Sequence, residues 1–346
     1  MLIVQKFGGS SLAGAERLRR AAAIIADCAD AGNKIVAVVS ARGDTTDELL
    51  GEARRISADA PARELDALLS CGETGSAAMT AMQLADMGKS CVSLTGAQAG
   101  ILTDSAHGAA RILSIDTARI LRELGDGKIV VAAGFQGAEE GGDTTTLGRG
   151  GSDTTAVELA AALSADRCEI YSDVDGIYTA DPRLVTGAVR LDRIDYGDML
   201  RLALHGSQVL HSRSVEAAMR ERVRVHLLSS FTRKEGTVMC DHPDRPGLCG
   251  VTRDPSLGTV SVIGREANAQ VLAEAVAALA HSDIIVTHTE LFDGGCSLFV
   301  SPDRLLPALE LVHRRFFRLF AFPLVFSDGY GEFRAFRRHF GRFLCA

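Results

Sequence analysis

The sequence GRGGSD, which begins at residue 148, combines side chains that could hold an anionic substrate. Gly150 and Gly151 let the backbone approach a ligand closely, and the guanidinium of Arg149 suits a two-pronged contact with a carboxylate or phosphate. Ser152 and Asp153 open an apolar run that predicts a helix, so this loop is expected at a helix N-terminus, where anions bind well. The alternative is a glycine turn capped by Ser152, with Arg149 in solvent.

A second glycine turn follows the first apolar run of the chain. Lys6 and Phe7 end a predicted strand, and Gly8, Gly9 and Ser10 offer backbone N–H groups before a predicted helix. Such a turn can hold the phosphates of a nucleotide, with the ammonium of Lys6 as a point charge. A simple strand-to-helix turn with a surface lysine is the alternative.

Polar side chains also follow the next predicted strand and open a later helix. Ser40, Thr45, Thr46 and Asp47 crowd a strand end, where a polar substrate would lie, and Glu73 is expected at the start of a helix over 74–87. The acid could receive a substrate ammonium. The alternatives are helix capping by Thr46 or Asp47 and a favourable contact of Glu73 with the helix dipole.

A further group of charged residues lies in the sequence YSDVDGIYTADPR. Asp173 leaves a predicted strand, and Asp181, Pro182 and Arg183 make a turn. Carboxylates here could meet ribose hydroxyls or a magnesium-bound water, and the guanidinium could meet a phosphate. Because aspartates are common in turns, a purely structural role is the alternative.

Alternating strands and helices must position these groups. The expected strands are 2–7, 34–40, 91–94, 129–133, 168–171 and 224–229, and the expected helices are 15–31, 74–87 and 152–163. This order predicts an α/β fold with an open, mainly parallel sheet sandwiched by helices. In such sheets ligands bind at the carboxyl ends of the strands, where all four groups fall.

The pattern changes after residue 232. Residues 1–232 are expected to form the catalytic domain and residues 233–249 a linker rich in proline and aspartate. Residues 250–315 are expected to form a small α+β module, with strands at 259–263, 284–291 and 297–300 and helices at 269–281 and 305–317.

Residues 316–346 form an anomalous tail rich in phenylalanine and arginine. One interpretation is a basic amphipathic segment for a membrane or nucleic acid. The other is a final segment translated out of frame or degraded. We favour the second because no steady 3.6-residue period survives there.

Composition restricts the function classes. The chain has 346 residues, 47% hydrophobic and 23% charged, with a net charge of −7, which predicts a soluble globular protein of two or three domains that does not bind nucleic acid. No apolar run is long enough for a membrane span, and the first residues lack the layout of a signal peptide. The 8 cysteines form no pattern of zinc ligands. We therefore expect a cytoplasmic protein with reduced thiols and no metal site built from its side chains.

The motifs, in their order, resemble those of the aspartate kinases of the amino-acid kinase family. The resemblance runs from about residue 4 to residue 230 through KFGGSS, SARGDTTDELL, TGAQAGILT, HGAARI, AGFQG, TTLGRGGSDTTA, YSDVDGIYTADPR and LHSRSVE. It implies the amino-acid kinase fold and the conversion of MgATP and L-aspartate to ADP and 4-phospho-L-aspartate. That reaction is the first step toward lysine, threonine and methionine, by way of diaminopimelate and homoserine.

The resemblance also implies a role for each matching residue. Lys6 would steady the transferring phosphoryl group, and Asp153 would orient Lys6. Arg149 would grip the α-carboxylate of the substrate, and Glu73 would face its α-amino group. The residues implied on the substrate side are Ser40, Thr45, Thr46, Asp47, Glu73, Arg149, Gly150, Gly151 and Ser152. The residues implied on the ATP side are Lys6, Phe7, Gly8, Gly9, Ser10, Ser172, Asp173, Tyr178, Asp181, Pro182 and Arg183.

The chain departs from the family pattern in three places. Gln208 stands where lysine is common and Ser212 where proline is usual, which puts one nucleotide contact in question. Only one incomplete ACT-like series is visible, where two ACT modules are normal. The resemblance implies feedback by lysine or threonine, without indicating which, and a homo-oligomer. A kinase for glutamate or UMP and an inactive amino-acid-binding regulator are the competing hypotheses.

Overall fold

The computed structural model describes residues 1–232, 234–242 and 247–317. Its largest sheet has 8 strands in the order β10-β12-β11-β9-β1-β2-β6-β3. The strands are β1 (Leu2–Phe7), β2 (Lys34–Val39), β3 (Cys91–Leu94), β6 (Ile129–Ala133), β9 (Arg167–Ser172), β10 (Arg193–Ile194), β11 (Val225–Ser229) and β12 (Thr237–Met239). From β3 to β11 all neighbours are parallel, and β12 pairs antiparallel with β11. The predicted open, mainly parallel sheet is confirmed.

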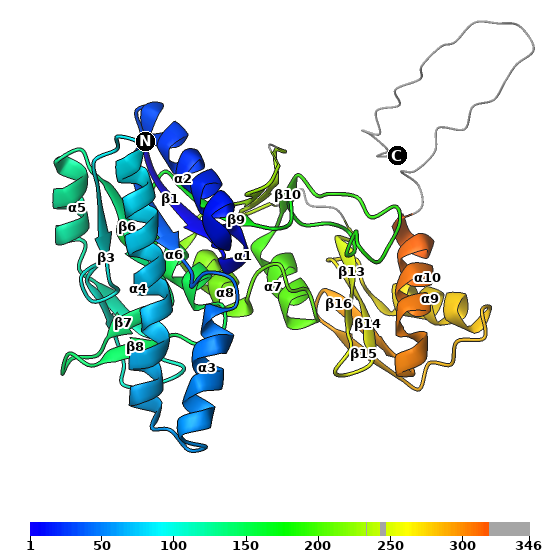
Figure 1. The fold of residues 1–346 in the computed structure, drawn as a ribbon. Helices are drawn as coiled ribbons and strands as arrows, with labels where there is room; N and C mark the ends of the chain where they lie inside the picture. Colours follow the sequence, from blue (N-terminus) through cyan, green and yellow to red (C-terminus); the bar gives the residue numbers. More distant parts are fainter. Residues whose placement is uncertain (233, 243–246, 318–346) are drawn as a thin grey trace, which may run out of the picture.

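Helices cover both faces of this sheet, which explains why its central strands are apolar throughout. One face packs against α2 (Gly14–Asp30) and α4 (Ala62–Asp86), in a core that includes Phe7, Ile25 and Leu84. The other face packs against α5 (Ala118–Gly125), α6 (Gly151–Ala162), α7 (Tyr196–Leu204) and α8 (Ser212–Glu221). Figure 1 shows the sheet between these layers.

The connections between strands carry smaller elements at the carboxyl ends of β1, β2 and β6. α1 (Gly9–Leu12) follows β1, and α3 (Thr45–Ile56) follows β2. A second sheet, in the order β5-β4-β7-β8, consists of β4 (Ile101–Thr103), β5 (Ile112–Ile115), β7 (Gln136–Ala138) and β8 (Thr144–Thr146). The turn before β5 also contacts the end of β8, because the N–H of Ala110 donates to the carbonyl oxygen of Thr146, 2.9 Å away. The sequence pattern did not predict this contact.

The C-terminal module is an α+β unit of the ACT-like kind. Its antiparallel sheet, in the order β13-β14-β16-β15, packs against two helices (Figure 1). The elements are β13 (Gly250–Asp254), β14 (Thr259–Ile263), α9 (Ala269–Ala280), β15 (His288–Phe292), β16 (Gly295–Phe299) and α10 (Leu305–Phe317), with a short 3₁₀ turn at Pro302–Arg304 before α10. Strand β13 was missing from the expected series.

The module boundaries also differ from the expected ones. β12 lies inside the expected linker and pairs with β11 and β10, so the large sheet extends past residue 232. Phe316 and Phe317, the first two residues of the expected tail, belong to α10 and pack against the module core. The rest of the tail, 318–346, lies outside the described residues.

Candidate active site

An ion pair lies where β1 meets α6. The Nζ of Lys6 is 2.5 Å from Oδ1 of Asp153, and the two side chains are 11% and 14% exposed. Lys6 is the penultimate residue of β1, and its neighbours across the sheet are Val38 and Ile170. Asp153 lies in the first turn of α6, where the helix dipole favours a negative charge. Lys6 is therefore held at a strand end by a carboxylate, and is not a surface lysine.

The turn after β1 brings backbone close to this ammonium. The N–H of Gly8 donates to the carbonyl oxygen of Tyr171, 3.3 Å away, and a Cβ on Gly8 would lie 3.6 Å from the Nζ of Lys6. A Cβ on Gly9 would lie 2.6 Å from the carbonyl oxygen of Ala41. Glycine is thus needed at residue 9 because two strand-end turns touch there.

Gly150 requires glycine for two reasons. Its φ is +72°, and a Cβ would lie 2.2 Å from the Cβ of His211, which precedes α8. Gly150 is also the N-cap of α6, and no side chain caps that end, so the expected alternative of a cap by Ser152 is wrong. The N–H of Gly151 donates to the carbonyl oxygen of Gly148, whereas the N–H groups of Ser152 and Asp153 are left to other acceptors.

The side chain of Arg149 is exposed. Within the described part of the chain, no hydrogen bond or ion pair holds its guanidinium. The main chain next to Arg149 is held in place, because the guanidinium of Arg213 donates to the carbonyl oxygens of Leu147 and Ala110. The structure thus presents a free cation on an anchored loop.

Glu73 was expected at a helix start but lies in the middle of α4, where it is 4% exposed. The helix-dipole alternative is therefore wrong. Its Oε1 accepts from the N–H of Ala41, at 3.0 Å, and its Oε2 is buried without a partner. Burial raises the pKa of Glu73 to about 7. A carboxyl with one unpaired buried oxygen is suited to receive a donor from a ligand.

Other substrate-side residues lie at neighbouring strand ends. The N–H of Ser40 donates to the carbonyl oxygen of Phe7, which joins the ends of β1 and β2. A Cβ on Gly72 would lie 3.5 Å from the methyl group of Thr45. Ser152 is buried against Gly134, which follows β6. The carboxyl ends of β1, β2 and β6 therefore lie beside α4 and the start of α6.

The expected capping of α3 is absent. Asp44 is the N-cap, and no side chain caps this helix. Thr46 and Asp47 lie within its first turn instead, and Asp47 is exposed. Their side chains are left to face solvent or a ligand.

A cavity of about 510 Å³ opens beside the ion pair. Among the expected ATP-side residues, its walls include Lys6, Ser172, Asp173, Tyr178, Asp181, Pro182 and Arg183, together with Asp153. Phe7, Gly8, Gly9 and Ser10 are not among the residues that line it, and neither are Arg149, Glu73 and the other substrate-side residues. The structure thus separates a nucleotide-sized cavity from the Glu73 side, with the Lys6–Asp153 pair on the wall of the first.

Two expected ATP-side residues are held by local contacts. The hydroxyl of Tyr178 donates to Asp175, at 2.7 Å, and the guanidinium of Arg183 pairs with Asp181, at 2.9 Å. The neighbouring Arg183 guanidinium holds the pKa of Asp181 below its usual range. The turn predicted at 181–183 is therefore present, with its two charges paired to each other.

The C-terminal module contributes to the same cavity. Thr252 and Arg253 of β13 line it, and so does Gln208, which stands where the family commonly has lysine. The module also holds the segment that carries Tyr178, because the hydroxyl of Thr179 lies 2.8 Å from Nε2 of His313 in α10. Sequence reasoning missed Arg253 because it lies in a strand far along the chain.

The departure at Ser212 has a local meaning. Ser212 is the first residue of α8, the position where proline is favoured because the N–H there needs no partner within the helix. Serine can occupy this position too, so the substitution leaves α8 in place.

In the described residues, no three His, Cys, Asp or Glu side chains come together as a metal site. None of the described helices is long and apolar enough to cross a membrane. No disulfide joins the cysteines of the described residues, which are Cys28, Cys71, Cys91, Cys168, Cys240, Cys249 and Cys296.

Comparison with known proteins places this geometry in context. The model of the amino acid kinase family matches residues 1–229. The aspartokinase of Mycolicibacterium smegmatis is 48% identical over 289 residues, which are 82% of this chain and 69% of that protein.

Solved structures of aspartate kinases are similar to this chain in fold. An aspartate kinase from Synechocystis has a TM-score of 0.64 at 36% identity, covering 90% of this chain and 54% of its own. E. coli aspartokinase III, in complex with aspartate and ADP in the R-state, has a TM-score of 0.67 at 26% identity, covering 90% and 84%. The same enzyme with lysine and aspartate, in the T-state, has a TM-score of 0.66 at 26% identity, covering 89% and 83%. This chain thus spans about half the length of the Synechocystis protein.

Proposed function

Since the chain belongs to the amino acid kinase family, we propose that it is an aspartate kinase, which transfers the γ-phosphoryl group of MgATP to the side-chain carboxylate of L-aspartate. The products are ADP and 4-phospho-L-aspartate, the entry step to lysine, threonine and methionine. The observation that carries this proposal is the Lys6–Asp153 ion pair on the wall of the cavity, at the N-terminus of α6. The high identity to curated aspartokinases supports the choice of substrate.

The chemistry requires little from a general base. The carboxylate of aspartate is already a nucleophile, so catalysis depends on holding two anions in line and neutralising the charge between them. Lys6 supplies a positive charge at the end of β1, and Asp153 fixes its direction. The uncapped N–H groups at the start of α6 add further donors, each worth roughly 2–4 kcal/mol of barrier if well placed.

Recognition of aspartate falls to the Glu73 side. Oε2 of Glu73 receives the α-ammonium, because it is the buried oxygen that lacks a donor. Arg149 closes on the α-carboxylate from its anchored loop. Ser40, Thr45 and Ser152 would supply polar groups near the carboxyl ends of the strands, with Thr46 and Asp47 in the first turn of α3 as further polar groups.

Recognition of the nucleotide falls to the cavity. Ser172, Asp173, Tyr178 and the turn 181–183 line its walls. Outside this lining, the backbone N–H groups of Gly9 and Ser10, at the start of α1, would be donors for the phosphates. Asp153 and Asp173 both line this cavity, and their carboxylates would supply hard oxygen donors to a magnesium ion held mainly by phosphates and water. When bound, the ion neutralises phosphate charge.

Regulation and assembly are part of the same proposal. The ACT-like module is where an end product, lysine or threonine, would bind as a feedback inhibitor. E. coli aspartokinase III has been solved with lysine, and that protein is related at 26% identity. We place the enzyme in the cytoplasm as a homo-oligomer, in keeping with described cysteines that form no disulfide and with its module type.

The test is to trap the product. Purified protein with MgATP, aspartate and hydroxylamine is expected to give aspartyl hydroxamate and an equal amount of ADP, and neither glutamate nor UMP should replace aspartate. Lysine and threonine are added separately to the same assay to find the inhibitor. A folded protein that forms no hydroxamate, or that phosphorylates glutamate or UMP faster, would contradict the proposal.

A further inference from the structure

Helix α4 presents a buried polar face to the active site. Along this face lie Asp66, Ser70, Glu73, Ser76 and Thr80, all less than a tenth exposed. Glu73 follows Asp66 by about two helical turns, so the two carboxyls project from the same side of the helix. Glu73 serves the proposed substrate site, whereas Asp66 has no role in the family resemblance.

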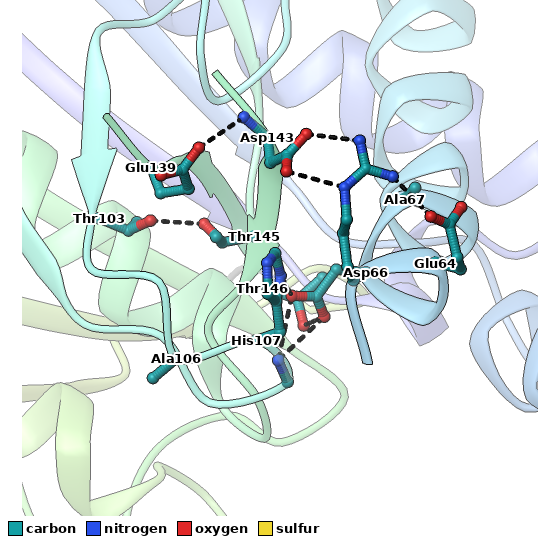
Figure 2. A network of polar contacts seen from close by, with 12 residues as sticks. Glu64, Asp66, Ala67, Thr103, Ala106, His107, Glu139, Asp143, Thr145 and Thr146 are labelled. Atoms are coloured by element: carbon teal, nitrogen blue, oxygen red, sulfur yellow. Dashed lines mark hydrogen bonds and ion pairs between the residues drawn. The ribbon is translucent and has the colours of Figure 1, made fainter. Parts of the chain in front are cut away.

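Asp66 is among the most buried charged residues of the described chain, at 1% exposure, and its carboxylate is fully engaged. Oδ1 accepts from the hydroxyl of Thr146, at 2.5 Å, and Oδ2 lies 2.8 Å from Nδ1 of His107. Both oxygens also accept from the N–H of Gly108, at 3.1 and 3.0 Å. Figure 2 shows Asp66 pointing from α4 toward His107 and Thr146. A buried carboxylate with this many donors holds its neighbours firmly.

The partners of Asp66 lead directly to the Arg149 loop. Thr146 ends β8, three residues before Arg149. The carbonyl oxygen of Thr146 accepts from the N–H of Ala110, at 2.9 Å. The next part of the loop also approaches this turn closely, because a Cβ on Gly148 would lie 3.0 Å from the carbonyl oxygen of Gly108. The turn at 107–110 and the start of the Arg149 loop therefore contact each other, and both are hydrogen-bonded to Asp66.

From this geometry we propose that Asp66 is a positioning residue, which fixes the loop carrying Arg149 at a set distance from Glu73. The inference rests on the proposed function, in which Arg149 and Glu73 bind the two ends of the same amino acid. Because both carboxyls project from one rigid helix, α4 sets the spacing between the two ends of the substrate site. A loosened Asp66 contact would let Arg149 drift while Glu73 stays in place.

A neighbouring contact offers a matched control. Arg63, one turn before Asp66 on α4, pairs with Asp143 in the turn before β8, at 2.5 Å, with the two side chains 52% and 41% exposed. Figure 2 shows Asp143 near Asp66 and Thr146. This pair links the same two elements, but it lies in solvent, where an ion pair adds little. If any link between α4 and β8 were sufficient, Arg63→Ala would have the same effect as a change at Asp66.

The experiment compares Asp66→Asn, Thr146→Val, Thr146→Ser and Arg63→Ala by steady-state kinetics and by calorimetric titration with aspartate. Asp66→Asn and Thr146→Val should raise the KM and the dissociation constant for aspartate about tenfold, with the KM for MgATP changed by less than about twofold. Thr146→Ser keeps the hydroxyl and should restore binding, and Arg63→Ala should match the wild type.

Two outcomes would overturn the inference. One is unchanged aspartate binding in both Thr146→Val and Asp66→Asn, and the other is an equal rise in both KM values, as expected of general damage. If Asp66→Asn does not fold, the Thr146 pair decides alone, because a valine fills the same space as a threonine. Wild-type protein that binds aspartate but forms no hydroxamate would refute the proposed function while leaving this inference testable by titration.

Discussion

The ammonium of Lys6 at the end of β1 meets the carboxylate of Asp153 in the first turn of α6, with 2.5 Å between Nζ and Oδ1. This contact joins two motifs that are about 150 residues apart in the sequence. It faces the cavity on one side and adjoins the glycine-rich helix start on the other. The proposed phosphoryl transfer takes place at this junction.

The first prediction concerns stability and pH. Burial raises the pKa of Glu73 from its ordinary value of 4.5 to about 7, so the folded protein holds this proton more tightly than the unfolded chain does. The stability that the proton contributes is complete below about pH 4.5 and is lost as the pH rises to about 7. Glutamine cannot ionise. Between about pH 4.5 and pH 7 the wild type should therefore lose about 3 kcal/mol of unfolding free energy relative to Glu73→Gln.

Urea denaturation at pH 4.5 and pH 8, without substrate, measures this difference for both proteins. Groups that titrate equally in both cancel in the comparison. A gap that stays constant with pH would mean that the pKa of Glu73 is the same in the folded and the unfolded protein.

A second prediction concerns aspartate binding. The α-ammonium prefers the ionised form of Glu73, so affinity should increase as the pH rises from about 6 to about 8. At pH 7 binding should release about half a proton, because roughly half of the Glu73 carboxyls are protonated in the free protein. Calorimetry in buffers with different ionisation enthalpies measures the release. Proton release by Glu73→Gln equal to that of the wild type would assign the effect to another group.

Arg149 gives a third prediction. Lysine keeps the charge but cannot make the two-pronged contact with a carboxylate, so Arg149→Lys should raise the KM for aspartate about tenfold. The side chain is exposed and without a partner in the described part of the chain, so the melting temperature should not change. Kinetics and thermal unfolding of the same preparation check both statements. A KM equal to that of the wild type would exclude Arg149 from the substrate site.

A fourth prediction concerns the C-terminal module. Arg253 lines the nucleotide cavity, and among the cations there it is the one without a paired carboxylate in the described residues, since Lys6 and Arg183 pair with Asp153 and Asp181. Arg253→Ala should therefore raise the KM for MgATP several-fold, by about the 1–2 kcal/mol of one charged contact, and leave that for aspartate unchanged. Arg265→Ala, at an exposed site of the same module, is the control. Equal KM values for MgATP in both variants would contradict a role for Arg253.

The sequence predicted the scaffold well because its signals are local. The strands β1 and β6, the edge strand β3 and the helix after GRGGSD lie where expected. Apolar strands buried on both faces, as β1 and β6 are, and helices with clear starts are easily recognised. The ends of these elements carry Lys6 and Asp153, and their pairing was expected from the family resemblance and not from the order of strand and helix.

Helix α4 was predicted only in part. The predicted helix began at residue 74, whereas α4 begins at Ala62. Because polar and apolar residues are both buried along α4, no single apolar stripe marks its extent. Within this helix, glycine is required at residue 72 because a Cβ there would lie 2.9 Å from the Cβ of Ala41. The missed first half of α4 contains Asp66, whose partners are distant in sequence and so gave no local signal.

The most direct test of the central claim is to remove the ammonium of Lys6. Lys6→Ala and the control Lys89→Ala, at a lysine that pairs with Asp30 away from the cavity, are assayed for aspartyl hydroxamate with MgATP and hydroxylamine. We expect Lys6→Ala to lose at least about a hundredfold in kcat while remaining folded, and Lys89→Ala to match the wild type. Hydroxamate formed by Lys6→Ala at the wild-type rate would contradict the account.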